Sequence, residues 1–360
     1  MARFWKELIY LLLMQSFLLP LAFAKKGSEP LYTEPFDLAA GGTCLTRASQ
    51  EGILFANPAL LPLGGAWIRW FGIEMGTISD KDSASQGRKG LSGLDSTQII
   101  NQLFSRSLHL GQTFSLSFLN KNVGISAFDR IELDLEGSRY DASGLPAINL
   151  GVEAYAGGVL SAALQPVPWL SLGLTGKYIG LAEPDISLPI ADPAAVQANI
   201  ADPNALRQQV KYGLGTGADF GALFFAQGHT LDLSLALKLD DVGGTHLTGG
   251  ADKIPQSAHV GLGLALHGNT SVLHLSLEHR DVLGVYEREP RFKKIYLGSR
   301  LMFRKLFGVA AGLYQGVPTF GIRSDLWFWK IGLTYYGREM GDYPGDKQRN
   351  LIMSYTTLGF

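Results

Sequence analysis

Residues 231–239 read LDLSLALKL, a run in which leucine occupies every second position. Successive side chains of a β-strand point to opposite faces, so the leucines share one face and the intervening residues share the other. The same alternation recurs at residues 114–118, 131–136, 260–266 and 273–277. This pattern predicts an all-β protein, and the fold then depends on which solvent the leucine faces meet.

The leucine faces favour a membrane barrel over a soluble β-sandwich. A sandwich core uses varied side-chain shapes because its two inner faces interdigitate. Here leucine is backed by Gly, Ala and Ser, which suits lipid outside and a crowded lumen inside. Charged residues make up 18% of the chain, below the roughly 25% typical of soluble domains. The net charge of −1 argues against a nucleic-acid partner. A soluble exported β-protein is the alternative.

The N-terminus predicts export. Arg3 and Lys6 precede an apolar core from about Leu8 to Leu21, and an A-x-A site ends at Ala24. Residues 1–24 are therefore expected to be a cleaved signal peptide, with an uncleaved anchor as the alternative. No second stretch is long and apolar enough to span a bilayer as a helix, so a membrane location requires a closed barrel.

The alternating segments predict about fourteen antiparallel strands between residues 65 and 360, an even number as in bacterial outer-membrane barrels. The strands are expected near 65–76, 112–119, 123–136, 150–165, 169–180, 212–225, 229–239, 257–267, 271–279, 293–303, 306–315, 318–325, 328–337 and 349–360. Short links follow every second strand, and mostly long links follow the others. Outer-membrane barrels sort their loops in this way, with short turns in the periplasm and long loops outside the cell. The predicted location is the bacterial outer membrane.

The aromatic residues and the C-terminus support the same location. Trp169 and Trp327 lie at predicted short turns, where an interfacial girdle is expected; ordinary core packing is the alternative. The chain ends on Phe360, with Leu358 and Ile352 on the same strand face. A terminal aromatic that closes an alternating strand resembles the signal of bacterial outer-membrane proteins, which implies the barrel-assembly machinery as a partner.

The faces opposite the leucines are expected to line the lumen, and their charges have both signs. They carry Asp134, Lys177, Asp232, Lys238, His274, Glu278, Lys294, Arg300, Arg323 and Lys330. A selective ion pore favours one sign, whereas mixed charges pair and fill space. Residues 25–64 show no clean alternation. A paired interior and this segment together favour a barrel, 65–360, that is plugged by residues 25–64.

One long loop contains a ten-residue repeat, IADPAAVQAN (190–199) followed by IADPNALRQQ (200–209). Each copy has an Asp-Pro pair, which supplies an N-cap and a first-turn proline. Two short helices are therefore expected on the extracellular rim. One interpretation is a duplicated loop with no specific role. The other is an apolar patch at the pore mouth formed by Ile190, Val196, Ile200 and Leu206.

The sequence contains no motif that predicts catalysis, a metal or a cofactor. The seven histidines form no H-E-x-x-H pattern, and the one cysteine, Cys44, allows neither a Cys-His zinc pattern nor an intrachain disulfide. There is no G-x-S-x-G elbow. His274 and Ser276 share a lumen face, but a nucleophile needs an orienting base across strands. The chain is expected not to be an enzyme.

Two short stretches ahead of the first strand carry a family resemblance. DLAAGGT (37–43) and TRASQEGILFANPALL (46–61) resemble the N-terminal hatch of the long-chain fatty acid transporter (FadL-like) family, and equally that of its PorV-like relatives. Asn57, Pro58 and Ala59 match the start of the family's Asn-Pro-Ala-Gly-Leu, and Leu60 stands where the family has glycine. The resemblance covers about twenty-five residues and extends loosely to a fourteen-strand barrel.

The resemblance implies a plugged barrel that takes up hydrophobic molecules and releases them through a kinked strand into the bilayer. It implies that Phe55, Asn57, Pro58, Ala59 and Leu60 lie in the hatch on the ligand path. The expected function is uptake of hydrophobic compounds such as long-chain fatty acids, with such lipids and outer-membrane lipid as partners. A PorV-like scaffold for protein secretion or surface attachment is the alternative, and a general porin is a third.

Overall fold

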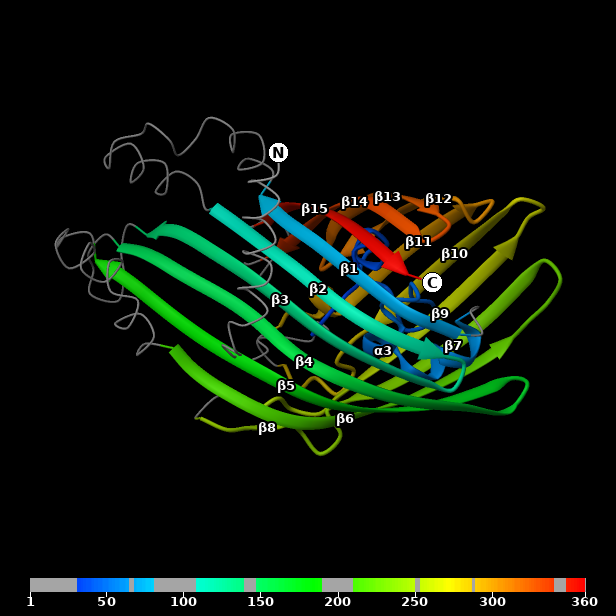
Figure 1. The fold of residues 1–360 in the computed structure, drawn as a ribbon, viewed down its shortest axis with the longest axis horizontal. Helices are drawn as coiled ribbons and strands as arrows, with labels where there is room; N and C mark the ends of the chain where they lie inside the picture. Colours follow the sequence, from blue (N-terminus) through cyan, green and yellow to red (C-terminus); the bar gives the residue numbers. More distant parts are fainter. Residues whose placement is uncertain are drawn as a thin grey trace.

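The computed structural model describes residues 31–64, 68–80, 108–138, 147–189, 210–249, 253–286, 289–339 and 348–359. Within these residues, fourteen antiparallel strands close into a barrel in which β5 pairs with β6 (Figure 1). The strands are β1 Ile68–Asp80, β2 Leu108–Asn120, β3 Val123–Ser138, β4 Ala147–Val167, β5 Leu170–Pro189, β6 Val210–Ala226, β7 Leu231–Asp240, β9 Ser257–His267, β10 Ser271–His279, β11 Ile295–Phe303, β12 Phe307–Tyr314, β13 Val317–Leu326, β14 Trp329–Glu339 and β15 Gln348–Gly359. A two-residue strand, β8 (His246–Leu247), adds to β6. The predicted barrel is confirmed.

The leucine faces point out of the barrel. On β7, Leu233 is 51% exposed, whereas Ala236 and Lys238 are 0% and 5% exposed. Exposed large apolar side chains of this kind continue around the strands from β2 to β14. In water such a surface would drive association, but in a bilayer the surrounding hydrocarbon is equally apolar. The fold is that of an outer-membrane barrel.

The connections are sorted between the two rims as predicted. Tight turns at residues 121–122, 168–169, 227–230, 268–270, 304–306 and 327–328 lie at one end of the barrel, which is on the right in Figure 1, and the C-terminus lies at the same end. Trp169 and Trp327 project from two of these turns and are 54% and 90% exposed. Their exposure excludes core packing and agrees with an interfacial girdle.

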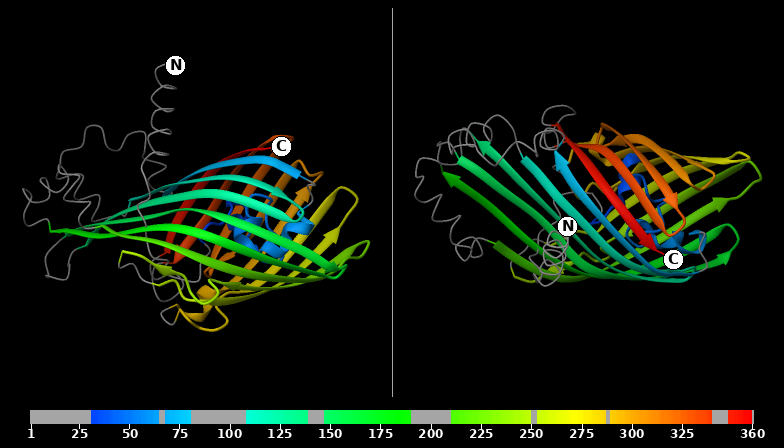
Figure 2. Two further views of the ribbon diagram at one scale, coloured as in Figure 1. Left: turned by 60° about the horizontal axis from the view of Figure 1, so that its bottom comes forward. Right: turned by 45° about the horizontal axis from the view of Figure 1, so that its top comes forward.

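Strands β4 and β5 form the long side of the barrel, and β5 extends well beyond its predicted end (Figure 2). The expectation that the second of them ends at residue 180 is wrong, because β5 continues to Pro189. Pro184 and Pro189 suggested a loop, but these residues pair with Val210 of β6 and Ala147 of β4. Neighbouring strands on both sides override the local signal.

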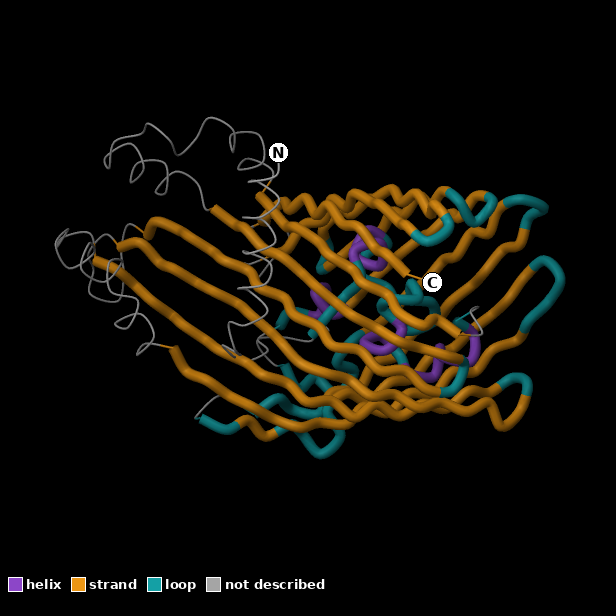
Figure 3. The backbone as a smooth tube through the Cα atoms, viewed as in Figure 1, coloured by secondary structure: helices purple, strands orange, loops and turns teal. Residues whose placement is uncertain are grey.

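An inner segment, residues 31–64, runs through the interior of the barrel (Figure 3). It contains α2 (Pro35–Ala39), α3 (Ile53–Ala56) and the 3-10 helix η1 (Pro58–Leu63), and a second 3-10 helix, η2 (Arg291–Lys294), precedes β11. The Glu34 side chain begins α2 by accepting from the Asp37 amide at 2.9 Å, with Pro35 at the first helical position. No helix within the described ranges has the length and apolar character to cross a bilayer.

Candidate functional site

The inner segment approaches the barrel wall at glycines. A Cβ atom on Gly298 or Gly312 would lie 2.1 or 2.5 Å from backbone atoms of residues 40–41, and one on Gly173 would lie 2.5 Å from backbone atoms of Pro58 and Ala59. A real Cβ cannot come this close to another heavy atom. The wall glycines therefore make the space into which this segment fits.

The predicted hatch residues lie together at this contact. Asn57 is 0% exposed; its side-chain oxygen accepts from the Ala59 amide and its nitrogen donates to the Leu45 carbonyl, both at 3.1 Å. Ser171 of β5 donates to the Ala59 carbonyl at 2.7 Å. Lys238 of β7 donates to the Phe55 carbonyl at 2.8 Å. Asn57 thus starts η1 and joins it to an earlier part of the segment.

Leu60, which replaces the family's glycine, has no unusual backbone. It lies within η1, is absent from the residues with positive φ, and is 3% exposed in the apolar core. Leucine is compatible with this geometry because the position does not need the left-handed conformation that glycine permits.

A large apolar cluster lies in the lumen on the side of β2–β7 (the apolar half), where Lys177, Asp219 and Lys238 are also buried. The buried cluster joins Phe55, Leu60 and other residues of the inner segment to β2–β7 and to Ile254 of the loop after β8. At its centre the Phe55 ring lies 4.8 Å from the Tyr32 ring and 5.0 Å from the Phe128 ring, measured between centroids. On this side of the lumen, the inner segment contributes apolar and aromatic side chains. Phe128 was not singled out from the sequence, although its alternating strand placed it on the lumen face.

The other half of the lumen is polar and ties the inner segment to β10–β14. The Glu278 carboxylate accepts from the amides of Cys44 and Leu45, both at 2.6 Å. Arg280, which is 2% exposed, donates to the Gly42 carbonyl at 2.5 Å and stacks on the Tyr296 ring at 4.2 Å. The contacts that Glu278 and Arg280 make with the inner segment join parts of the chain more than two hundred residues apart.

The lumen charges pair with one another, as the mixed signs predicted. Lys177 pairs with Asp219 at 2.6 Å and Lys238 with Asp240 at 2.7 Å. Other pairs reach the inner segment: Lys330 with Glu51 at 2.8 Å and Arg300 with Asp37 at 3.4 Å. The acidic partners in the inner segment were not expected from the sequence, because no local pattern marks them.

The ladder between β4 and β5 has a gap in its pairing next to the apolar half, with the same register on both sides of the gap. Strands β4 and β5 pair from Gly151 with Asp185 and again from Ala156 with Gly180, but residues 152–155 and 181–184 between these points have no partners across this ladder. The same residues stay paired on their other sides, with β3 and β6. Tyr155, Leu181 and Ala182 at this interruption belong to the apolar cluster. The break therefore lies between the lumen core and the outside of the barrel.

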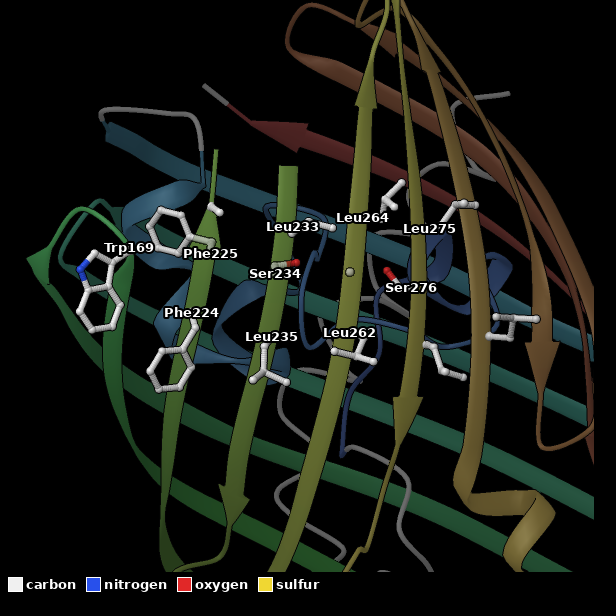
Figure 4. Close-up of a pocket in the computed structure, with 14 residues that line it drawn as sticks. Trp169, Phe224, Phe225, Leu233, Ser234, Leu235, Leu262, Leu264, Leu275 and Ser276 are labelled. Atoms are coloured by element: carbon white, nitrogen blue, oxygen red, sulfur yellow. The ribbon is translucent and has the colours of Figure 1, made fainter. Parts of the chain in front are cut away.

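A depression of 640 Å³ on β5–β11 is a different feature (Figure 4). It is lined by Trp169, Phe224 and outward leucines such as Leu233 and Leu262, which are 51% and 54% exposed. It therefore belongs to the lipid-facing surface. The candidate mouth residues Ile190, Val196, Ile200 and Leu206, the signal peptide and Phe360 lie outside the described residues.

Cys44 gives a direct probe of the inner segment. The thiol is 3% exposed, and burial raises the pKa of Cys44 to about 12. We expect a maleimide to label the folded barrel at pH 8 at least about 100-fold more slowly than the unfolded chain, because the thiolate is scarce and shielded. Mass spectrometry of timed samples measures this, with urea-unfolded protein as the control. Equal labelling rates would show that residue 44 is not held inside.

Comparisons with known proteins bear on the fold. No protein-family model matches the sequence, and no curated protein matches it. Among solved structures it is similar to the toluene transporter TbuX of Ralstonia pickettii, with 11% identity, TM-score 0.56 and coverage of 92% of this chain and 98% of that one. For the Pseudomonas putida toluene transporter TodX, the identity is 12% and the TM-score 0.50, with coverage of 92% of this chain and 99% of that one. For the CymD monoaromatic hydrocarbon channel, the identity is 10% and the TM-score 0.51, with coverage of 91% of this chain and 97% of that one.

These structures cover nearly the whole of both chains, and at such low identity they show the fold alone. All three are transporters or channels, and none is an enzyme. The fourteen-strand barrel that the hatch resemblance implied is confirmed.

Proposed function

We propose that this protein is an outer-membrane channel for hydrophobic compounds, with the inner segment as its hatch. The observation that carries the proposal is the apolar half of the lumen, where Tyr32, Phe55 and Phe128 pack against one another between the inner segment and the wall. A water-filled porin has a polar interior. An interior with a large apolar face is instead suited to a solute that gains free energy by leaving water.

The polar half of the lumen has the complementary role. Arg280, Glu278 and Lys330 hold one flank of the inner segment to the wall through buried charged contacts, which are costly to break singly. The opposite flank is held by apolar packing around Phe55 together with the hydrogen bonds from Ser171 and Lys238, and an apolar solute can replace the packing at low cost. We therefore place the solute path on the side of β2–β6, with exit at the interruption between β4 and β5.

Monoaromatic hydrocarbons and long-chain fatty acids are the two candidate solute classes. TbuX, TodX and CymD carry hydrocarbons according to their descriptions, and the hatch motif resembles that of fatty acid transporters. The aromatic centroid spacings of 4.8 and 5.0 Å around Phe55 are within the range over which aromatic rings attract one another, and this supports the hydrocarbon class.

Uptake measurements test this proposal. Cells that contain the protein should accumulate radiolabelled toluene or oleate faster than matched cells without it, because the channel replaces the slow crossing of the outer leaflet. Steady ion conductance in planar bilayers should stay low, because the inner segment fills the lumen. Equal uptake of both solutes with and without the protein would contradict the proposal, and large steady conductance would favour a porin.

A further inference from the structure

Asp129 is an ionisable residue on the outer, lipid-facing surface of the barrel. It lies on β3, where Ser126 and Phe128 are 2% and 4% exposed in the lumen, whereas Ile125 is 53% exposed on the outside. Asp129 shares the outward face with Ile125, because side chains alternate along a strand. The pairing of β3 with β2 and β4 continues through this region without a shift in register. The carboxylate therefore points away from the lumen.

Asp129 lies at the depth of the membrane. Six residues separate it from Val123, where β3 begins at a tight turn. At about 3.3 Å per residue and a strand tilt of about 40°, this is about 15 Å of height, within an apolar band about 25 Å tall. Further from the tight turns, Leu110 of β2 is still 45% exposed. Asp129 is thus in the half of the band nearer the cell exterior.

The described residues offer this carboxylate no cation. The adjacent Arg130 faces the lumen and pairs with Glu132 at 2.5 Å. The Phe114 amide of β2 is the polar group that acts on Asp129. The Oδ1 atom of Asp129 is shielded and has no hydrogen-bond partner within the described part of the chain. An ionisable side chain at membrane depth is costly, and such residues commonly mark a pathway for a solute.

The pathway beside Asp129 is the gap in pairing between β4 and β5. Asp129 pairs with Ala156 of β4, and Ala156 pairs with Gly180 of β5, which is the pair that borders the gap. The three strands run side by side on the long side of the barrel (Figure 1). Neighbouring strands are about 4.8 Å apart, so the gap begins within about 10 Å of Asp129. Ala156 and Gly180 put no bulky side chain in this row.

We propose that Asp129 selects by charge the solutes that leave through this gap, passing uncharged hydrocarbons and holding back carboxylate anions. This inference rests on the proposed function, with its exit between β4 and β5. A fatty acid that leaves by this route carries its carboxylate past Asp129. Two like charges about 8 Å apart, at an effective dielectric constant of about 20, repel strongly enough to slow passage about 10-fold or more. An uncharged aromatic ring meets no such repulsion.

Oleate and methyl oleate form a matched pair of solutes for the test, because they share one chain and differ in charge. Initial uptake of both, and of toluene, would be measured in cells that contain equal amounts of folded barrel, checked by heat-dependent gel mobility. The nearly isosteric Asp129→Asn should raise the ratio of oleate to methyl oleate uptake about 10-fold and leave toluene uptake unchanged. Asp129→Glu keeps the charge and should keep the ratio of the parent.

Thr77→Asp provides the control for position. Thr77 is exposed on the outer face of β1, two strands from β3 and further from the gap. Added to Asp129→Asn, it returns a carboxylate to the outer face but not to the gap, so the raised ratio should persist. The inference is overturned if Asp129→Asn leaves the ratio unchanged, or if Thr77→Asp restores the parent ratio. If the parent speeds uptake of none of the three solutes, the proposed function fails and this inference with it.

Discussion

Replacing Arg280 by methionine is expected to lower the free energy of unfolding by about 3–5 kcal/mol, the usual effect of removing one partner of a buried ion pair. The guanidinium donates to the Gly42 carbonyl at 2.5 Å and lies 3.3 Å from the Glu278 carboxylate. Without it, the 0% exposed Glu278 loses its nearest cation and must either bury an unpaired charge or take up a proton. Urea unfolding in detergent micelles, followed by tryptophan fluorescence, measures the change.

Two further variants show whether the loss comes from charge. Arg291→Met removes a basic residue that is exposed in η2 and should change stability by less than about 0.5 kcal/mol. Adding Glu278→Gln to Arg280→Met should recover part of the loss, because both charges are then gone. A loss below about 1 kcal/mol in Arg280→Met would show that the polar half of the lumen does not anchor the inner segment.

Gly173→Val is expected to force the Asn57-Pro58-Ala59 turn away from β5. Its Cβ would lie 2.5 Å from backbone atoms of Pro58 and Ala59, so no side-chain rotation relieves the clash. Overpacking of this kind costs about 1–3 kcal/mol. We expect Cys44 to react with maleimide at least about 10-fold faster than in the parent, and steady conductance in planar bilayers to rise.

Gly176→Val is the matched control on the same strand. Gly176 faces outward, and a Cβ there would have only one neighbour, at 4.0 Å. This variant should keep Cys44 shielded and the conductance low. If the two variants behave alike, the turn does not depend on contact with Gly173, and the inner segment is not held in place by the wall glycines.

Much of the fold was predictable because alternation is a local property. The run at 231–239 has lipid on one face and the packed lumen on the other, so its sequence alone assigned the two faces correctly. The part of β5 beyond residue 180 was not predictable, because Pro184 weakens the local signal and its neighbours in β6 hold it in the sheet. The gap in pairing between β4 and β5 contains Pro184, but the alternation pattern does not reveal that pairing is lost there.

The candidate site was also predictable only in part. The Asn57 turn was found because Asn-Pro is a local turn signal and because the motif resembles a known hatch. Arg280 was not found: it lies in a predicted loop, and its partner at Gly42 is 238 residues away.

Photolabelling with an apolar probe tests the central claim, that hydrophobic solutes occupy the lumen beside the inner segment. A tritiated diazirine derivative of toluene would be photolysed with the purified barrel and the labelled peptides mapped by mass spectrometry. Detergent-facing strands will take up label in any case, but residues 53–61 are inside and serve as the readout. The account predicts label at 53–61 that excess toluene or oleate removes. Label confined to the outward leucines, with none at 53–61, would contradict it.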